Sequence, residues 1–244
     1  MSQGSHRMPR PNSRSCQAAV AAVAVVIAAV TASCTRTVEG VAAGPAAGKG
    51  AMVDGGNLES LLLTPDVVSG IVGLPNMVTI SSWMKPDTSD SGESYVPRDC
   101  LGALYSGMSV VYAGNGYSSI FQTRTGPNKS KPDATPSIDQ SASAFDSPAE
   151  AQKAMDEYLD TLHNCAGKDF TYTRIQLTWK LGSPTDAGNG ITTMESTLQG
   201  GDQVIDRALA VKGNVLVEVQ SQDRKPLADE VKKIMDKVLD QIGS

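Results

Sequence analysis

One unbroken apolar run stands out in the hydrophobic pattern, and it lies near the start of the chain. Residues 18–32 are almost wholly Ala, Val and Ile, and the polar residues before them include Arg7, Arg10 and Arg14. A basic segment followed by a short apolar run is typical of a secretory signal peptide. The run is shorter than the roughly 20 residues that a membrane-spanning helix needs. We therefore expect residues 1–33 to be a signal peptide, and a permanent membrane-spanning helix is the weaker alternative.

The next segment, residues 34–56, has no periodic apolar face. It is rich in Ala and Gly, a composition that is typical of a flexible linker. We expect a tether here, followed by one folded domain over residues 57–244.

Three later segments carry apolar residues three or four positions apart, which is the spacing of an amphipathic helix. A short helix is expected between Thr64 and Gly73, and a long one between Ser147 and Gly167. Ser and Thr are favoured before the first turn of a helix, and Gly is favoured after its last turn. A third helix is expected to start at about Leu227 and to close the chain.

Shorter runs between the helices have the β-branched composition or the alternation of strands. Gly114-Asn115-Gly116 and Gly213-Asn214 are typical hairpin turns, and the first would join a strand over residues 109–113 to one over residues 117–125. Further strands are expected at residues 77–83, 138–145, 170–182 and 190–200, and on both sides of Gly213-Asn214. The expected fold is α+β, an antiparallel sheet with helices packed on one face.

Cys34 ends the motif Thr31-Ala32-Ser33-Cys34. This motif resembles a bacterial lipobox, in which the cysteine is lipidated and becomes the new N-terminus, although Thr31 replaces the usual aliphatic residue. Val30-Thr31-Ala32 also has the small-residue spacing of an ordinary signal peptidase site, which would release the chain just before Cys34. Because a tether makes most sense when its start is fixed, we favour lipidation of Cys34, and secretion is the alternative.

Cys100 and Cys165 remain as a pair, because Cys16 lies in the signal peptide. Two cysteines in an exported domain of this length typically form a disulfide. The long loop that it would close corresponds to about 4 kcal/mol of stabilisation in the chain-entropy model. A metal site is the rival interpretation, but two distant thiols with almost no histidine are a poor ligand set, and we expect no metal.

The charge balance excludes nucleic acid as a partner. Without the three arginines of the signal peptide, 18 basic residues face 26 acidic ones, which gives a formal charge of −8. Proteins that bind nucleic acid present clustered basic residues, and no such cluster occurs here. An acidic domain is also not expected to lie on an anionic membrane surface.

Residues for catalysis are scarce. His163 is the only histidine outside the signal peptide, and its place in the last turn of a predicted helix favours a structural role. No nucleophile elbow, phosphate loop or dinucleotide fingerprint is present. We therefore expect neither an enzyme nor a cofactor, and an envelope hydrolase that uses His163 is the weakest alternative.

Binding is the remaining class of function. Tyr112, Tyr117 and Trp179 carry amphipathic rings that suit a pocket, and Arg207 alternates with apolar residues in a predicted strand. These four are the candidate ligand-binding residues. Core packing is the alternative for the rings, and a cross-strand ion pair is the alternative for Arg207.

Six short motifs occur in an order that resembles a known family. They are LLLTPDVVSGIVG, DCLGAL, SVVYAG, a helix that ends in CAG, WKLG and RALAVKGNVLVEV. Together they are similar to the extracellular sensor domain of the mycobacterial kinase PknH and to exported lipoproteins that carry this domain without a kinase. The resemblance covers essentially residues 57–244.

This resemblance implies an antiparallel sheet flanked by helices, a solvent-filled cleft for a small ligand, and pairing of Cys100 with Cys165. A second disulfide of the family is absent, because its positions correspond to Ile205 and Gln222. No kinase segment is present, so signalling by phosphorylation is not implied.

The combined hypothesis is a lipoprotein on the outer face of the cell membrane. Its sensor domain would bind a small molecule, a lipid or a cell-wall fragment in a cleft. The alternative is an interaction module that docks on another envelope protein, through the polar loops at residues 86–97 and 126–136, without a small ligand.

Overall fold

The computed structural model describes residues 52–88, 94–127, 130 and 134–243. The expected signal peptide, Cys34 and most of the expected tether lie outside the described residues. Within the described ranges, no helix is both long and apolar enough to cross a membrane.

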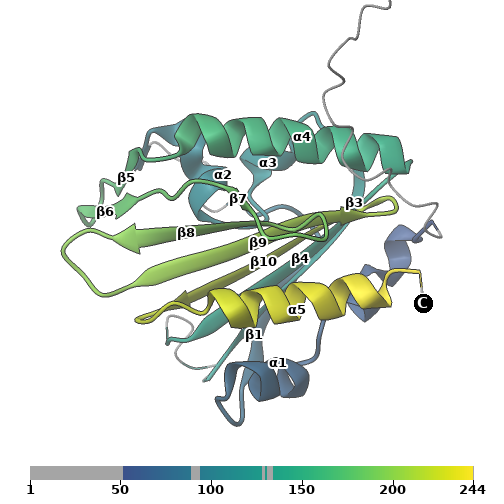
Figure 1. Ribbon diagram of the computed structural model, residues 1–244, viewed down its shortest axis with the longest axis horizontal. Helices are drawn as coiled ribbons and strands as arrows, with labels where there is room; N and C mark the ends of the chain where they lie inside the picture. Colours follow the sequence, from purple (N-terminus) through teal and green to yellow (C-terminus); the bar gives the residue numbers. More distant parts are fainter. Residues whose placement is uncertain (1–51, 89–93, 128–129, 131–133, 244) are drawn as a thin grey trace, which may run out of the picture. The chain divides into compact units, whose positions relative to one another are not determined.

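Strands with alternating side chains build one antiparallel sheet of ten strands, in the order β1-β3-β4-β10-β9-β8-β6-β5-β2, with β7 paired to β8 (Figure 1). Their bounds are β1 Val78–Trp83, β2 Tyr95–Val96, β3 Tyr117–Gly126, β4 Ser137–Phe145, β5 Asp169–Tyr172, β6 Leu177–Lys180, β7 Thr185–Asp186, β8 Thr192–Leu198, β9 Val204–Lys212 and β10 Val215–Asp223.

Helical segments lie before, between and after these strands. The α-helices are α1 Pro65–Val72, α2 Leu101–Leu104, α3 Ser109–Tyr112, α4 Pro148–Cys165 and α5 Ala228–Gln241, and two 3-10 helices are η1 Gly55–Leu61 and η2 Arg98–Cys100. The two long helices begin and end close to the predicted positions. Ser147 caps α4 as expected, since its hydroxyl accepts a hydrogen bond from the backbone N–H of Glu150.

Alternation along the central strands divides the buried side chains into two cores. In β10, Val217 belongs to one core and its neighbour Leu216 to the other. Successive side chains of a strand point to opposite faces of its sheet. The two cores therefore lie on opposite faces.

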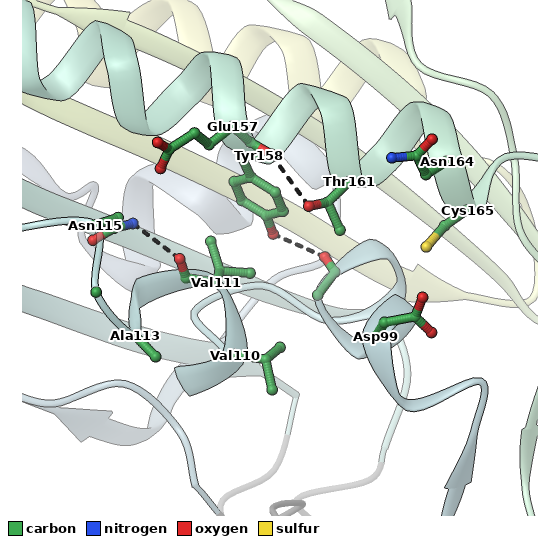
Figure 2. A pocket seen from close by; sticks show the side chains of 12 residues that line it. Asp99, Val110, Val111, Ala113, Asn115, Glu157, Tyr158, Thr161, Asn164 and Cys165 are labelled. Carbon is green, nitrogen blue, oxygen red and sulfur yellow. Dashed lines mark hydrogen bonds between the residues drawn. The ribbon is translucent and has the colours of Figure 1, made fainter.

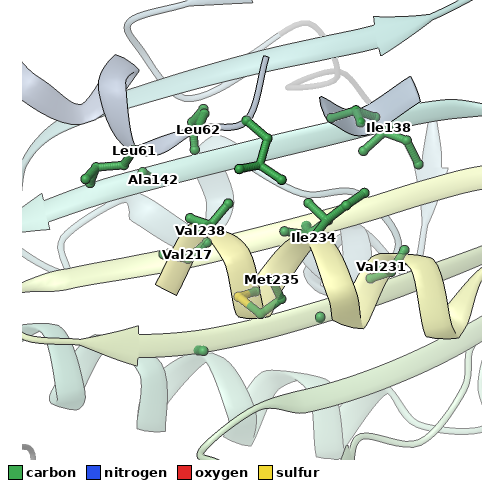
Figure 3. Close-up of a cluster of buried hydrophobic side chains, with 14 of the residues drawn as sticks. Leu61, Leu62, Ile138, Ala142, Val217, Val231, Ile234, Met235 and Val238 are labelled. Atoms are coloured by element: carbon green, nitrogen blue, oxygen red, sulfur yellow. The ribbon is translucent and has the colours of Figure 1, made fainter. Parts of the chain in front are cut away.

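The first core lies between the sheet and α5, η1 and α1 (Figure 3). Val231, Ile234, Met235 and Val238 of α5 are fully buried and recur at helical spacing. Burial of each such side chain contributes roughly 1.5–3 kcal/mol. The amphipathic pattern of α5 is thus explained by its contact with β9 and β10.

The second core lies on the other face, under α4, α2 and α3. Figure 1 shows α4 and α5 on opposite sides of the sheet. The predicted α+β class and antiparallel sheet are confirmed. The helices, however, cover both faces and not one, because the central strands are apolar on both of their faces.

Residues 109–113 do not form the expected strand of a hairpin. Ser109–Tyr112 forms the short helix α3, and Gly114 and Gly116 turn the chain into β3 with φ of +85° and +80°. A four-residue apolar run has no period that separates helix from strand, so its buried contacts decide its conformation.

The second predicted hairpin is confirmed, since Gly213 and Asn214 connect β9 to β10. The side chain of Asn214 accepts a hydrogen bond from Val53 N at 2.8 Å and donates to Val53 O at 3.0 Å and to Phe145 O at 2.8 Å. Asn214 thus fastens the first described residues to the turn between two central strands.

Candidate functional site

A cleft of about 420 Å³ opens between α4 and the segment that contains α2 and α3 (Figure 2). Its volume lies in the range of small-molecule sites. The lining residues are Asp99, Gly102, Val110, Val111, Ala113, Gly114, Asn115, Glu157, Tyr158, Thr161, Asn164 and Cys165.

Helical spacing explains why α4 supplies one wall of the cleft. Glu157, Tyr158, Thr161, Asn164 and Cys165 lie on one side of α4, since residues three, four and seven positions apart share a helix face. The opposite wall is shorter and irregular. Because α2 and α3 have only four residues each, they cannot be held by their own helical hydrogen bonds and need other contacts.

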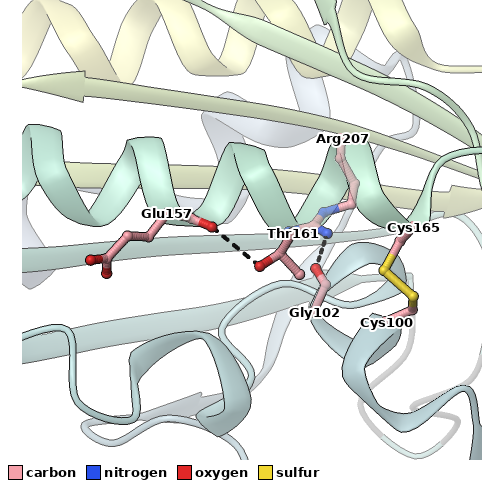
Figure 4. Close-up of a disulfide and its surroundings, with 6 residues drawn as sticks. All are labelled: Cys100, Gly102, Glu157, Thr161, Cys165 and Arg207. Atoms are coloured by element: carbon pink, nitrogen blue, oxygen red, sulfur yellow. Dashed lines mark hydrogen bonds between the residues drawn. A yellow bond between two sulfur atoms is a disulfide. The ribbon is translucent and has the colours of Figure 1, made fainter. Parts of the chain in front are cut away.

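The first of these contacts is covalent. Cys100, directly before α2, is bonded to Cys165, the last residue of α4, with a Cα–Cα distance of 5.6 Å (Figure 4). The structure therefore contains the predicted disulfide. Both half-cystines are buried, and the bond joins the two walls at one end of the cleft.

The second contact is a buried ion pair beneath the cleft. Arg207 of β9 and Glu218 of β10 approach to 2.6 Å, and both side chains are 0% exposed. Arg207 also donates a hydrogen bond to Gly102 O at 2.5 Å. Arg207 therefore links the sheet to the backbone of α2.

Tyr158 completes this arrangement from the side of α4. Its hydroxyl oxygen accepts a hydrogen bond from Arg207 at 2.6 Å and lies 2.8 Å from Gly102 O and 2.9 Å from Glu218 Oε2. Burial raises the pKa of Tyr158 well above its ordinary value. The phenol remains neutral and can donate its proton to either of the two oxygens.

Tyr112, the last residue of α3, is held by the same carboxylate. Its hydroxyl donates to Glu218 at 2.5 Å. Burial and the negative charge of Glu218 raise the pKa of Tyr112, so this phenol also stays protonated and acts as a donor.

The turn between α2 and α3 is held by polar side chains of the sheet. Ser106 N donates to Gln220 at 2.8 Å, and Gly107 N donates to Glu218 at 3.1 Å. Gly107 has φ of +65°, and a Cβ at this position would lie 1.6 Å from the side-chain oxygen of Gln122. Only glycine allows this close approach. The wall of the cleft is thus fixed to the sheet largely by buried hydrogen bonds.

The side chains around the cleft are suited to the binding of a ligand. The buried charges and phenols use most of their hydrogen-bonding groups on one another and on the backbone of the wall, while Arg207 Nε has no hydrogen-bond partner among the described residues. His163 lies exposed in the last turn of α4 and does not line the cleft. In the described part of the chain, no group of three or more His, Cys, Asp and Glu side chains could hold a metal ion.

The four candidate ligand-binding residues do not line the cleft. Arg207 and Tyr112 lie behind its walls, in the network around Glu218. Tyr117 packs against Tyr112 with the ring centroids 5.4 Å apart, and Trp179 is buried in the second core. The structure thus brings Arg207, Tyr112 and Tyr117 close to the site, and it places Trp179 among the residues that pack the core.

Sequence reasoning missed most residues of the cleft itself. The sequence predicts Cys165 as a disulfide partner, and it predicts Tyr158 only as part of the apolar stripe of the helix between Ser147 and Gly167. The polar residues beside this stripe, Thr161 and Asn164, could have indicated a helix face that is only partly covered. No pattern in the sequence shows that α2 and α3 lie opposite them.

Comparison with known proteins agrees with this architecture. The family model of the PknH-like extracellular domain matches residues 53–241. The crystal structure of the extracellular domain of PknH from Mycobacterium tuberculosis has a TM-score of 0.70 and 25% sequence identity to this chain, and the match covers 78% of this chain and 96% of that one.

Full-length relatives give the same result. The serine/threonine-protein kinases PknH of Mycobacterium tuberculosis and of Mycobacterium bovis are each 29% identical to this chain over 192 residues, or 76% of it. The chain spans only 29% and 31% of the length of these relatives. The similarity is to the extracellular domain and not to the kinase domain, and so it indicates no enzymatic role. The chain belongs to the family of PknH-like extracellular domains, which points to an exported protein with a sensor-like domain.

Proposed function

We propose that this protein is a cell-envelope lipoprotein whose extracellular domain binds a small polar ligand in the cleft between α4 and the α2–α3 segment. The observation that carries the proposal is the cleft itself, with its volume of about 420 Å³. Both walls are fixed by the Cys100–Cys165 disulfide and the Arg207–Glu218 network. A site with rigid walls loses little conformational entropy when it binds a ligand.

The proposed anchor is Cys34, followed by the Ala- and Gly-rich tether. A flexible chain of this length spans about 25 Å on average. It would keep the binding domain close to the outer face of the membrane while leaving the cleft accessible. Secretion without lipid remains the alternative for localisation.

Native mass spectrometry tests both the ligand and the lipid anchor. The full chain is purified in mild detergent from the envelope of cells that export it. We expect a reproducible adduct that is lost on denaturation, together with the mass of acyl chains on the peptide that begins at Cys34. An unmodified Cys34 would disprove the anchor. A clean protein mass under native conditions would disprove the ligand.

A second candidate function is docking on another envelope protein. It is favoured by a separate hollow of about 320 Å³ at the end of β1, lined by Ser82, Trp83, Met84, Lys85 and Phe121. Met84 is 82% exposed there, beside the half-buried ring of Trp83, and apolar side chains that remain accessible at one place can form an interaction surface. Crosslinking from this hollow to one defined partner, with no adduct in the cleft, would favour this function.

A further inference from the structure

The chemistry of the cleft lining carries an inference about the class of ligand. Two lining residues, Asp99 and Glu157, have exposed carboxylates, whereas none of the described residues that line the cleft is Lys, Arg or His. They come from opposite walls, since Asp99 precedes α2 and Glu157 lies on α4 (Figure 2).

Several hydrogen-bond donors of the lining are already in use, although the exposed amide of Asn164 can both donate and accept. The Asn115 side chain donates to Val111 O at 2.9 Å, and the Thr161 hydroxyl donates to Glu157 O at 3.2 Å. Tyr158 directs its hydroxyl inward, to Gly102 and Glu218. The two carboxylates therefore shift the balance of the lining toward acceptors, and such a site suits a ligand that donates hydrogen bonds.

Two further features of the cleft favour a positively charged ligand. The cleft extends to the last turn of α4, at Asn164 and Cys165, and the C-terminus of a helix carries a partial negative charge that favours cations. Behind the lining, Arg207 contacts Gly102 and Tyr158 but is paired with the carboxylate of Glu218. At the surface, Glu157 lies 3.5 Å from Lys153. The side chain of Lys153 is 75% exposed, and such surface pairs are weak and easily exchanged.

One side of the lining is aliphatic. Val110, Val111 and Ala113 come from α3 and the residue after it. They offer a surface to the carbon skeleton of a ligand, while the two carboxylates face its charged groups.

We infer that the cleft selects a small organic cation, an amine or guanidinium compound whose short apolar body packs on Val110, Val111 and Ala113 while its charged groups meet Asp99 and Glu157. This inference rests on the proposed function, because it names the ligand class for the same cleft. It makes charge, and not only size and shape, the basis of selection.

A series of five-carbon probes tests this selection with the full chain in mild detergent. 1,5-Diaminopentane, 1,5-pentanediol and glutarate share a five-carbon skeleton, and their end groups are cationic, neutral and anionic. Backbone amide NMR titrations report both the affinity and the place of binding. We expect the diamine to shift the amides of residues 110–115 and 157–165 in a saturable way, the diol to bind at least fivefold more weakly, and glutarate to produce no saturable shift.

Substitutions locate the effect. Asp99→Asn and Glu157→Gln are each expected to weaken diamine binding at least threefold. Asp156→Asn removes the same charge from the neighbouring position of α4, which is exposed and does not line the cleft, and should leave the affinity unchanged. Glutarate binding as tight as that of the diamine, no saturable diamine binding, or equal losses in Asp156→Asn and Glu157→Gln would each overturn the inference.

The results distinguish a failure of the cationic selection from a failure of the proposed ligand binding. If an envelope-derived adduct occupies the cleft but has no basic group, the proposed function stands and the cationic selection is wrong. If neither an adduct nor the diamine binds, both are wrong.

Discussion

Arg207 and Glu218 are two charged residues placed where neither can reach water, and the rest of the cleft depends on them. Removing a charge from water costs several kcal/mol, which is recovered only when its partners are well placed. Here the guanidinium meets a carboxylate, a phenol and a carbonyl. The ion pair therefore acts mainly as a fixed link between the sheet and the wall of the cleft.

Arg207→Met, which keeps most of the side-chain volume, leaves Glu218 buried without its counter-charge. We expect a loss of about 3–5 kcal/mol in the free energy of unfolding, measured by urea denaturation. The matched control is Lys180→Met, which breaks a pair with Asp169 in which the two side chains are 52% and 57% exposed. This control should cost at most about 1 kcal/mol. Equal losses in the two variants would show that the buried pair has no special role.

The sequence supports part of this residue-level picture. Alternation in the strand allowed a cross-strand ion pair for Arg207, and its contact with Glu218 of β10 confirms that alternative. That the pair is fully buried could not be predicted, because the burial comes from Gly102 and Tyr158. These residues lie over a hundred and about fifty positions from Arg207 in the chain, and only the packing of α2 and α4 brings them together.

Among the elements, the start of α5 is bonded to an acidic side chain of the sheet. Asp206 of β9 accepts a hydrogen bond from Leu227 N at 2.6 Å, just before α5 begins. Burial raises the pKa of Asp206, against the opposing effect of this hydrogen bond, and the charges of Glu195 and Glu230 raise it further.

A raised pKa means that the folded protein holds a proton that the unfolded chain has already lost. Stability from this group is therefore greatest at low pH and decreases as the pH rises from the unfolded to the folded pKa. Asp206→Asn can still accept from Leu227 but does not titrate. We expect its stability relative to the unsubstituted protein to increase as the pH rises above about 4, as measured by urea denaturation at a series of pH values. A difference in stability that stays flat across this range would contradict the prediction.

The elements also differ in how far they could be predicted. The long helices α4 and α5 have several apolar residues at one period and clear start or stop signals, and their positions were predicted within a few residues. The helices α2 and α3 have only four residues each, which is too short for their apolar residues to show a helical spacing. Their conformation is imposed by buried hydrogen bonds to Glu218 and Gln220, which a local pattern does not contain.

At the scale of the whole molecule, one sheet separates two cores, and the disulfide belongs to only one of them. It joins the end of η2, directly before α2, to the end of α4 in the second core. In the unfolded chain it closes a loop between residues 65 positions apart, and in the folded protein it holds the two walls of the cleft together.

Replacement of Cys100 and Cys165 by Ser removes both effects. We expect the free energy of unfolding to fall by about 4 kcal/mol, from the chain-entropy model, and binding in the cleft to weaken as its walls separate. Thermal unfolding followed by circular dichroism measures the first effect. The unsubstituted protein treated with reductant serves as the control and should unfold at a similar temperature. A double-serine variant as stable as the oxidised protein would show that the hydrogen bonds alone hold the wall.

Asn214, at the turn between β9 and β10, has a mechanical consequence. It holds Val53 by both its N–H and its carbonyl, so a pull on the N-terminal chain is applied to that turn. Both strands of the turn are central and are hydrogen-bonded to neighbours on either side, so the load is shared across the middle of the sheet. The α2–α3 wall lies outside this path of force. If the chain is anchored as proposed, tension on its N-terminal segment would therefore leave the shape of the α2–α3 wall unchanged.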